Sequence, residues 1–299
     1  MKHTRKKSTG KKRHMLLLPV FLVAVVALIL VAAAPVSWAF GGHGHGKVEL
    51  DEAEVFIEYN STDGDFGIHF FWDGEPWKWM TVWNEHLWPV LNVSIRENVR
   101  AQGLTEAFFE SAEPTLDELS FQEFLERFPE DEYRFRGRTL DWKRLVGEAD
   151  FTHVIPCPFD EEDDEIEVNW VPGTPLLSVE WDEVTDVVEL TQDIEPDELP
   201  DCIDGPADLI VGYEAVFELV VLEDDEEQVY KETAILPADA EIFTASPEFT
   251  QLAVEAENAA IGGTIEGAEL KVEVIAKEES GNSTITEIGV FEYSEENGE

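Results

Sequence analysis

The stretch "FGIHFFWDGEPWKWMTVWNEHLW", residues 66–88, decides how the N-terminal half is interpreted, because it carries five tryptophans. Two aromatic runs flank the turn signal "DGEP", and this arrangement predicts a β-hairpin. Pairing across that turn places large apolar side chains on one shared face, namely Phe66, Ile68, Phe70, Trp72, Trp77, Trp79 and Trp83. We expect this face to be buried as the core of the first module. The alternative is that the rings are exposed and that Trp72, Trp77, Trp79 and Trp83 form a ligand platform.

The first forty residues predict export. Seven basic residues precede the apolar run 15–34, and the small residues Ser37 and Ala39 follow it. This order is typical of a signal peptide cut before Phe40. An apolar run of 20 residues is also long enough to span a bilayer, so an uncleaved N-terminal anchor is the alternative. Either way, we expect the rest of the chain to be secreted or held in the cell envelope.

The mature chain is strongly acidic. Without residues 1–39 it has 13 Lys and Arg against 66 Asp and Glu, a formal charge of −53. Such a field repels phosphate backbones and anionic lipid, so nucleic-acid binding and membrane contact beyond an N-terminal anchor are not expected. A hydrated acidic surface is one interpretation of this composition, and calcium binding is the other.

A calcium site is predicted in "NSTDGDFG". Asn60, Asp63 and Asp65 supply hard oxygen ligands within a tight turn, as Ca²⁺ prefers. The bidentate glutamate that would close a calcium loop is missing, and turn-forming residues explain the same pattern without metal. No cofactor is expected apart from this possible calcium, although the two histidines of "GGHGHG" (41–46) offer a weak signal for Cu, Ni or Zn.

One short helix is predicted in the first module. Ser120 and Glu123 form a capping-box pattern ahead of apolar residues at helical spacing, and Pro129 follows. The segment 133–151 then predicts a hairpin with a loop at residues 141–143.

The predicted hairpin carries the only basic cluster of the mature chain, Arg134, Arg136, Arg138, Lys143 and Arg144. With the expected register, Arg136 faces Glu148 and Arg134 faces Asp150, so local ion pairs account for the arginines. A site for an anion or an acidic polysaccharide is the alternative.

The C-terminal half shows strand signals and no convincing helix, which predicts a two-sheet sandwich. Trp181 in "LSVEWDEV", Tyr213 in "VGYEAVFEL", and the alternating strand "LKVEVIAKEESGNST" with Gly281 in its turn resemble the fibronectin type III pattern. Leu270 departs from that pattern, since the family usually has an aromatic residue there. The resemblance implies a binding or spacer module.

Two cysteines, Cys157 and Cys202, are expected to form a disulfide, because an exported chain meets an oxidising compartment. In the resembled topology the chain entry and the long loop between the second and third strands lie at the same pole. The resemblance therefore supports the pairing.

Known catalytic motifs are missing: there is no G-x-S-x-G, H-E-x-x-H, P-loop or Rossmann glycine pattern. The sequence thus favours a non-enzymatic binding or scaffold protein with an unknown protein or glycan partner. The alternatives are a carbohydrate-binding or carbohydrate-active secreted protein that uses the aromatic hairpin, and an envelope calcium binder.

The fold class expected is mainly β, with two β-sandwich-like modules. Along the chain we expect a signal peptide or anchor (1–39), a Gly/His spacer (40–46), a strand-rich module (47–155), a fibronectin type III-like domain (156–293) and an acidic tail (294–299).

Overall fold

The computed structural model describes residues 46–294, apart from 85, 87, 112–119, 160–164, 172, 175, 191–198, 207–208 and 224–225. The predicted signal segment, most of the spacer and most of the acidic tail lie outside the described residues. The described part of the chain is mainly β, as expected, and belongs to one compact unit, Gly41–Glu299. The boundary at residue 155 stays a prediction.

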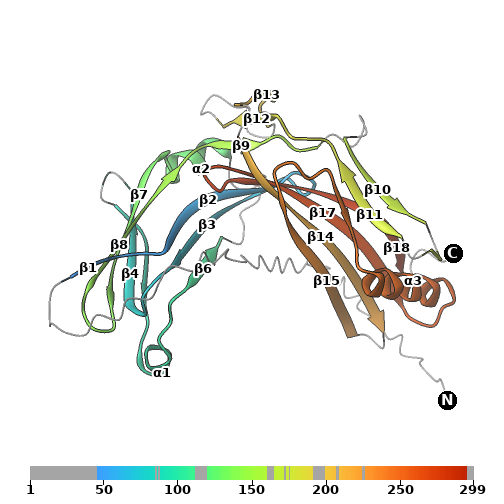
Figure 1. The fold of residues 1–299 in the computed structure, drawn as a ribbon, viewed down its shortest axis with the longest axis horizontal. Coiled ribbons are helices and arrows are strands. Elements are labelled where there is room, and N and C mark those ends of the chain that lie inside the picture. The colour runs from blue at the N-terminus through green and yellow to red at the C-terminus, as the bar shows by residue number, and fades with distance from the viewer. Residues whose placement is uncertain are drawn as a thin grey trace, which may run out of the picture. The chain divides into compact units, whose positions relative to one another are not determined.

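Two large sheets contain most of the strands (Figure 1). The five-stranded sheet has the order β1-β8-β7-β4-β5, with β1 Lys47–Glu49, β8 Arg144–Phe151, β7 Asp131–Thr139, β4 Trp77–Trp83 and β5 Pro89–Ser94. The seven-stranded sheet has the order β15-β14-β17-β18-β2-β3-β6, with β15 Glu226–Pro237, β14 Ile210–Glu223, β17 Gly267–Glu278, β18 Ser283–Ser294, β2 Glu52–Asn60, β3 Asp65–Asp73 and β6 Ala107–Glu110. Strands from both halves of the sequence therefore share one sheet, because β18 pairs in parallel with β2.

The first sandwich forms where the five-stranded sheet packs against β2 and β3. Its core is aromatic: the ring of Trp72 on β3 lies 5.5 Å from that of Trp77 on β4 and 6.0 Å from that of Phe135 on β7. All three side chains are fully buried. Rings in edge contact of this kind add about 0.5–1.5 kcal/mol per pair beyond the apolar area they bury.

The expected hairpin across "DGEP" is wrong. β3 pairs with β2 and β6, whereas β4 pairs with β5 and β7, so the two aromatic strands lie in different sheets and face each other across the core. The register also shifts between Trp77 and Trp79, and this irregularity changes which face each later residue of β4 occupies. Met80 and Val82 are consequently buried in the core, while Trp79 and Trp83 are only partly buried.

Among the residues that the structure describes, two helices accompany the first sandwich. α2, Phe121–Arg127, begins at the predicted cap, where the Ser120 hydroxyl accepts a hydrogen bond from the backbone N–H of Glu123 at 3.4 Å. α1, Glu97–Gln102, is not predicted by the sequence pattern, and it ends at Gly103, whose φ of 73° is in the left-handed region.

The second predicted hairpin is present, with a register that differs from the expected one by two residues. Arg134 lies opposite Glu148, and Arg136 lies opposite Val146. The loop starts one residue earlier than expected, since Thr139 ends β7 and Trp142 adopts a positive φ of 73°.

In the C-terminal half, β14, β17 and their neighbours pack against a three-stranded sheet of order β10-β11-β16, with β10 Ile166–Trp170, β11 Leu177–Trp181 and β16 Ile242–Thr244. Trp181 ends β11 as expected and lies 5.5 Å from Tyr213, whose hydroxyl accepts a hydrogen bond from the N–H of Val184.

The expectation of a helix-free C-terminal half is wrong. α3, Pro247–Ile261, covers this sandwich with Phe249, Ala253 and Ala256. The sequence does contain the helix signals, because Ser246 caps the helix by accepting a hydrogen bond from the N–H of Phe249, and Pro247 follows at the first helical position.

The disulfide between Cys157 and Cys202 is confirmed, with a Cα–Cα distance of 6.1 Å. Cys157 follows β9, Val154–Pro156, in the small sheet β13-β12-β9, whose other strands are β12 Asp186–Glu189 and β13 Ile203–Asp204. The bond therefore attaches the segment just before β13 to the entry of the C-terminal half.

Candidate functional site

The four tryptophans predicted as a platform divide into two pairs. Trp72 and Trp77 are 0% exposed and lie in the core, so they cannot contact a ligand. Trp79 and Trp83 are partly buried on the outer face of the five-stranded sheet, which points away from the core. A platform built from all four rings is therefore wrong for this fold.

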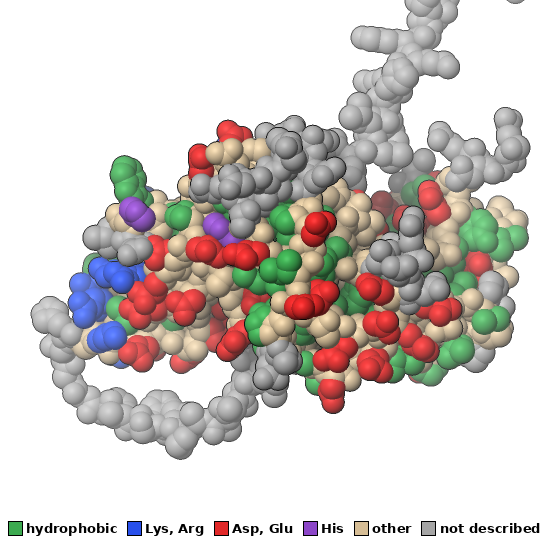
Figure 2. Space-filling view, turned by 90° about the horizontal axis from the view of Figure 1, so that it is seen from above, with side chains coloured by type: hydrophobic (Ala, Val, Ile, Leu, Met, Phe, Trp, Pro, Cys, Tyr) green, Lys and Arg blue, Asp and Glu red, His purple; other side chains and the backbone are tan. Residues whose placement is uncertain are grey.

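The outer face of the five-stranded sheet combines Trp79 and Trp83 with arginines, and we call it the Trp–Arg face. In register, Arg138 lies beside Trp79, Arg134 lies beside Trp83, and Arg136 lies between them beside Thr81. Because alternate residues of a strand share a face, these side chains project from the same side of the sheet. In Figure 2, Lys and Arg side chains gather in one region, whereas acidic side chains cover much of the remaining surface.

The charges on the Trp–Arg face are only partly compensated. Arg134 forms an ion pair with Glu132 at 2.7 Å, and Arg138 donates to the backbone oxygen of Trp142 at 3.0 Å. Arg136 is exposed and makes no ion pair with any described residue. Arg138 lies directly opposite Arg144, a like-charge pair that disfavours the sheet unless an anion lies nearby.

A further aromatic and basic contact extends this surface at the end of the β7–β8 hairpin. Lys78 Nζ lies 3.7 Å from the ring centroid of Trp142, which is 64% exposed. Lys143 forms ion pairs with Glu75 at 3.0 Å and Asp141 at 3.3 Å. The predicted cross-strand pairs, Arg136 with Glu148 and Arg134 with Asp150, are absent from the register. Arg134 instead lies opposite Glu148, and this is the one acidic residue that the described strands place opposite an arginine of β7.

The predicted calcium ligands lie in the turn that joins β2 to β3. The Asn60 side-chain oxygen accepts hydrogen bonds from the backbone N–H groups of Thr62 and Asp63, and its amide donates to Asp63 at 3.0 Å. Gly64 completes the turn with a φ of 68°. These contacts are those of an Asx-turn, and calcium binding by Asn60, Asp63 and Asp65 stays a prediction.

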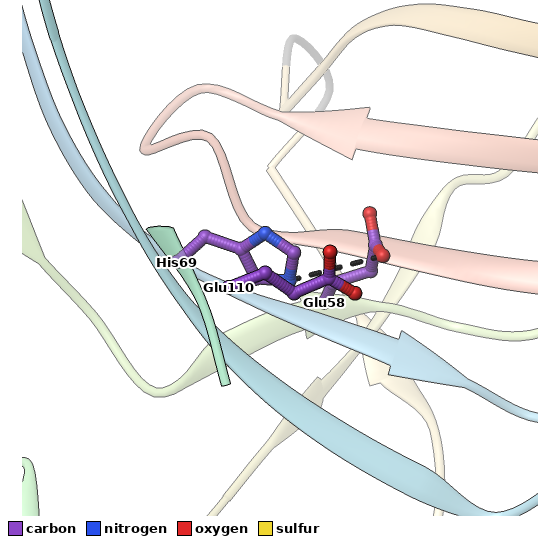
Figure 3. A group of neighbouring side chains, drawn as sticks. All are labelled: Glu58, His69 and Glu110. Atoms are coloured by element: carbon purple, nitrogen blue, oxygen red, sulfur yellow. Dashed lines mark ion pairs between the residues drawn. The ribbon is translucent and has the colours of Figure 1, made fainter. Parts of the chain in front are cut away.

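A second cluster, which the sequence pattern does not single out, lies on the face of β2, β3 and β6 opposite the aromatic core. One donor atom each from Glu58, His69 and Glu110 lies within 4.8 Å of the other two, and their side chains point toward one another (Figure 3). His69 lies opposite Glu110 in register, and its Nε2 is 3.8 Å from Glu58 Oε1. His69 and Glu58 are buried, whereas Glu110 is exposed.

Burial determines the protonation of this cluster. It raises the pKa of Glu58 to about 8, with a smaller contribution from the negative charge of Glu110, and it lowers the pKa of His69 to about 4. Near neutral pH the Glu58 carboxyl is therefore mostly protonated and the His69 imidazole is neutral. The two groups form no ion pair under these conditions.

The sequence offers only a weak signal for this cluster. Glu58 and His69 are polar residues inside otherwise apolar strands. The alternation of apolar and polar residues places His69 in a strand but does not indicate that it binds a ligand. Only the pairing of β3 with both β2 and β6 brings the three side chains together.

Among the described residues, no helix is both long and apolar enough to cross a membrane.

The architecture is that of a mainly β protein with two sandwich-like modules, and comparisons with known proteins identify no family. No family model and no curated protein matches the sequence. Among solved structures, the chain is similar to the FN1–FN3 domains of chicken CNTN1, with 9% identity, a TM-score of 0.26, and coverage of 82% of this chain and 67% of that one.

Two structures from adhesion proteins are also similar. One is a bacterial ice-binding adhesin, with 10% identity, a TM-score of 0.19, and coverage of 83% of this chain and 66% of that one. The other is a tandem repeat from the extending region of a large adhesion protein, with 8% identity, a TM-score of 0.20, and coverage of 81% and 50% respectively. At these values the similarity defines neither a family nor a ligand.

Proposed function

We propose that the protein is an exported, strongly acidic, non-enzymatic binding or scaffold protein of the cell envelope or extracellular space. We further propose that the Trp–Arg face is its docking surface for an anionic polysaccharide. The disulfide between Cys157 and Cys202 supports export, because such bonds persist in oxidising compartments.

The observation that carries the proposal is the exposed positive charge of the Trp–Arg face in a chain with 66 acidic and 20 basic residues. Arg136 has Thr81 and Val146 as its register neighbours, and Arg144 has Arg138, so neither lies opposite a carboxylate. Unpaired like charges cost stability when they lie side by side. The net charge of the chain opposes the long-range approach of a polyanion, but an anionic partner held at this basic face would remove that cost and would gain charge-assisted hydrogen bonds from the guanidinium groups.

The aromatic residues favour a glycan over an acidic protein as this partner. Trp79 and Trp83 lie four residues apart on one strand, which separates their backbones by about 13 Å. Partly exposed rings at this spacing offer apolar surfaces for sugar rings, and the arginines between them match carboxylate or sulfate groups. A neutral glycan would use the rings but not the arginines.

Titration of the mature protein with polygalacturonate, heparin and neutral dextran tests the proposal, with tryptophan fluorescence and salt dependence as readouts. We expect binding of the two anionic polymers that weakens as ionic strength rises, and no binding of dextran. Arg136→Ala should weaken binding about tenfold or more, since a lost charge-assisted hydrogen bond costs about 1.5–3 kcal/mol.

Arg127→Ala is the matched control, because Arg127 is an exposed arginine in the last turn of α2. It should leave the affinity unchanged. If both variants lost the same affinity for the polysaccharide, the effect would follow from net charge alone, and a defined binding site on the Trp–Arg face would be contradicted. Salt-sensitive self-association without polysaccharide binding, measured by analytical ultracentrifugation, would instead assign the face to the acidic surface of a second copy.

A further inference from the structure

From the cluster on β2, β3 and β6 we infer that Glu58, His69 and Glu110 bind one divalent transition-metal ion, with Zn²⁺ as the fitting probe. The site lies on another face of the protein from the Trp–Arg face and does not depend on the proposed polysaccharide binding.

The geometry of the three donors is the first argument. They come from three neighbouring strands, so the sheet hydrogen bonds hold their backbones at set distances. Donor atoms in a tetrahedral zinc site lie about 3.4 Å apart, given metal–ligand bonds of about 2.1 Å. The donors here lie within 4.8 Å of one another, and Glu110 is exposed at the end of β6. An exposed side chain at a strand end can change its rotamer, so Glu110 can move toward the other two donors.

The second argument is that neither ring nitrogen of the buried imidazole is hydrogen-bonded to a described residue, which leaves the Nε2 that faces Glu58 able to ligate a metal ion. His69 is 1% exposed, and its Nδ1 makes no hydrogen bond to any described residue. Its Nε2 is 3.8 Å from Glu58, which is too long for a hydrogen bond. His153 shows the contrast, because its Nε2 lies 2.7 Å from the backbone oxygen of Phe128.

The third argument concerns the space beside the imidazole. Gly67 lies in register with Glu58, and a Cβ at this position would be 2.9 Å from His69 Nε2. A larger residue at this position would therefore require the imidazole or the backbone to shift. Phe56 stacks on the other side at a centroid distance of 4.7 Å and holds the ring plane.

A bound metal ion would displace the proton of Glu58, because carboxylates ligate metals in the deprotonated form. Lys277 is the cation whose field reaches both Glu58 and His69, and it is bound to Glu214 at 2.7 Å. One imidazole with two carboxylates suits Zn²⁺ or Mn²⁺, whereas Ca²⁺ and Mg²⁺ prefer oxygen ligands alone. Three protein ligands also leave one coordination position for water.

Equilibrium dialysis of the mature protein against ZnCl₂, in the presence of excess CaCl₂, tests the inference. The protein should carry His43→Ala and His45→Ala, which removes the histidines of the spacer as competing ligands. The excess Ca²⁺ saturates weak sites on the acidic surface. We expect one tightly held zinc per chain and a melting temperature that rises with zinc concentration.

Glu110→Gln is the main variant, because an exposed strand-end residue can be replaced without unfolding the protein. It should weaken zinc binding at least tenfold, and His69→Asn should abolish the tight site. Glu106→Gln, an exposed carboxylate four residues away, is the matched control and should leave the affinity unchanged. No stoichiometric zinc, or equal affinities for Glu110→Gln and Glu106→Gln, would overturn the inference whatever the outcome of the polysaccharide titration.

Discussion

Replacement of Asn282 by alanine should strongly destabilise the protein, because this polar side chain is fully buried and fully hydrogen-bonded. Asn282 is 0% exposed and lies in the turn between β17 and β18. Its side-chain oxygen accepts a hydrogen bond from the N–H of Ile57 at 2.7 Å, and its amide donates to the backbone oxygens of Thr152 at 3.1 Å and Val154 at 2.7 Å. One side chain thus joins this turn to two segments that are each more than one hundred residues away in the sequence.

The magnitude follows from the groups that the substitution leaves without a partner. A buried backbone N–H or C=O that loses its hydrogen bond costs about 1–3 kcal/mol. The substitution leaves three such groups without a partner. Water that enters the small cavity can hydrate some of them, so we expect a loss of unfolding free energy near the lower end of the summed cost, about 3 kcal/mol. For a chain of this size that corresponds to a decrease in melting temperature of roughly 6–12 °C.

Urea unfolding of the oxidised mature protein, followed by tryptophan fluorescence and far-UV circular dichroism, measures the change. Asn169→Ala is the control, because Asn169 makes only one side-chain hydrogen bond among the described residues, to Glu180 at 3.2 Å, on a partly exposed strand. It should cost less than about 1 kcal/mol. A loss for Asn282→Ala that is no larger than that of the control would refute the argument that buried hydrogen bonds at this turn join the two halves.

Three further predictions test the disulfide, the β4 register and a buried carboxylate. Replacing Cys157 and Cys202 by serine should lower the free energy of unfolding by up to about 4 kcal/mol, since the bond closes a loop with a sequence separation of 45, and urea midpoints would show it. Met80→Ala should cost about 2–5 kcal/mol because Met80 is fully buried, whereas Trp79→Ala should cost less, and the opposite order in thermal melts would support the regular hairpin register instead. Burial raises the pKa of Glu273 to about 7, so its folded form holds a proton that the unfolded chain releases above its ordinary pKa near 4.5, and this contribution to stability is lost as pH rises from about 4.5 through 7. Glu273→Gln should therefore gain stability relative to the wild type between pH 5 and pH 8, and a constant difference over that range would exclude the shift.

Local patterns predict several elements correctly. The cap at Ser120, the strand that ends at Trp181 and the turn at Gly281 depend on neighbouring residues, so each can be found from a short window of sequence. α3 is not predicted although its cap at Ser246 and its Pro247 are equally local signals, because the prediction for this half rests on its strand patterns alone.

The prediction for the aromatic stretch is correct in part: Phe66, Ile68, Phe70, Trp72 and Trp77 are buried in the core as expected, whereas the hairpin and the burial of Trp79 and Trp83 are wrong for a physical reason. Alternation predicts which residues share a face only while the strand is regular, and one register shift after Trp77 reverses the faces. The choice of strand partner is also non-local: β3 pairs with β2, its sequence neighbour on the other side, so "DGEP" connects two sheets and does not close a hairpin.

The sequence by itself determined the acidic charge, the mainly β class, the basic cluster and the expected pairing of the two cysteines, because composition and short-range patterns contain that information. The tertiary structure alone decided which tryptophans are buried, which arginines lack an acidic neighbour, and that Glu58, His69 and Glu110 come within 4.8 Å of one another. Strand order and register set these results, and both depend on packing between residues that are far apart in the chain.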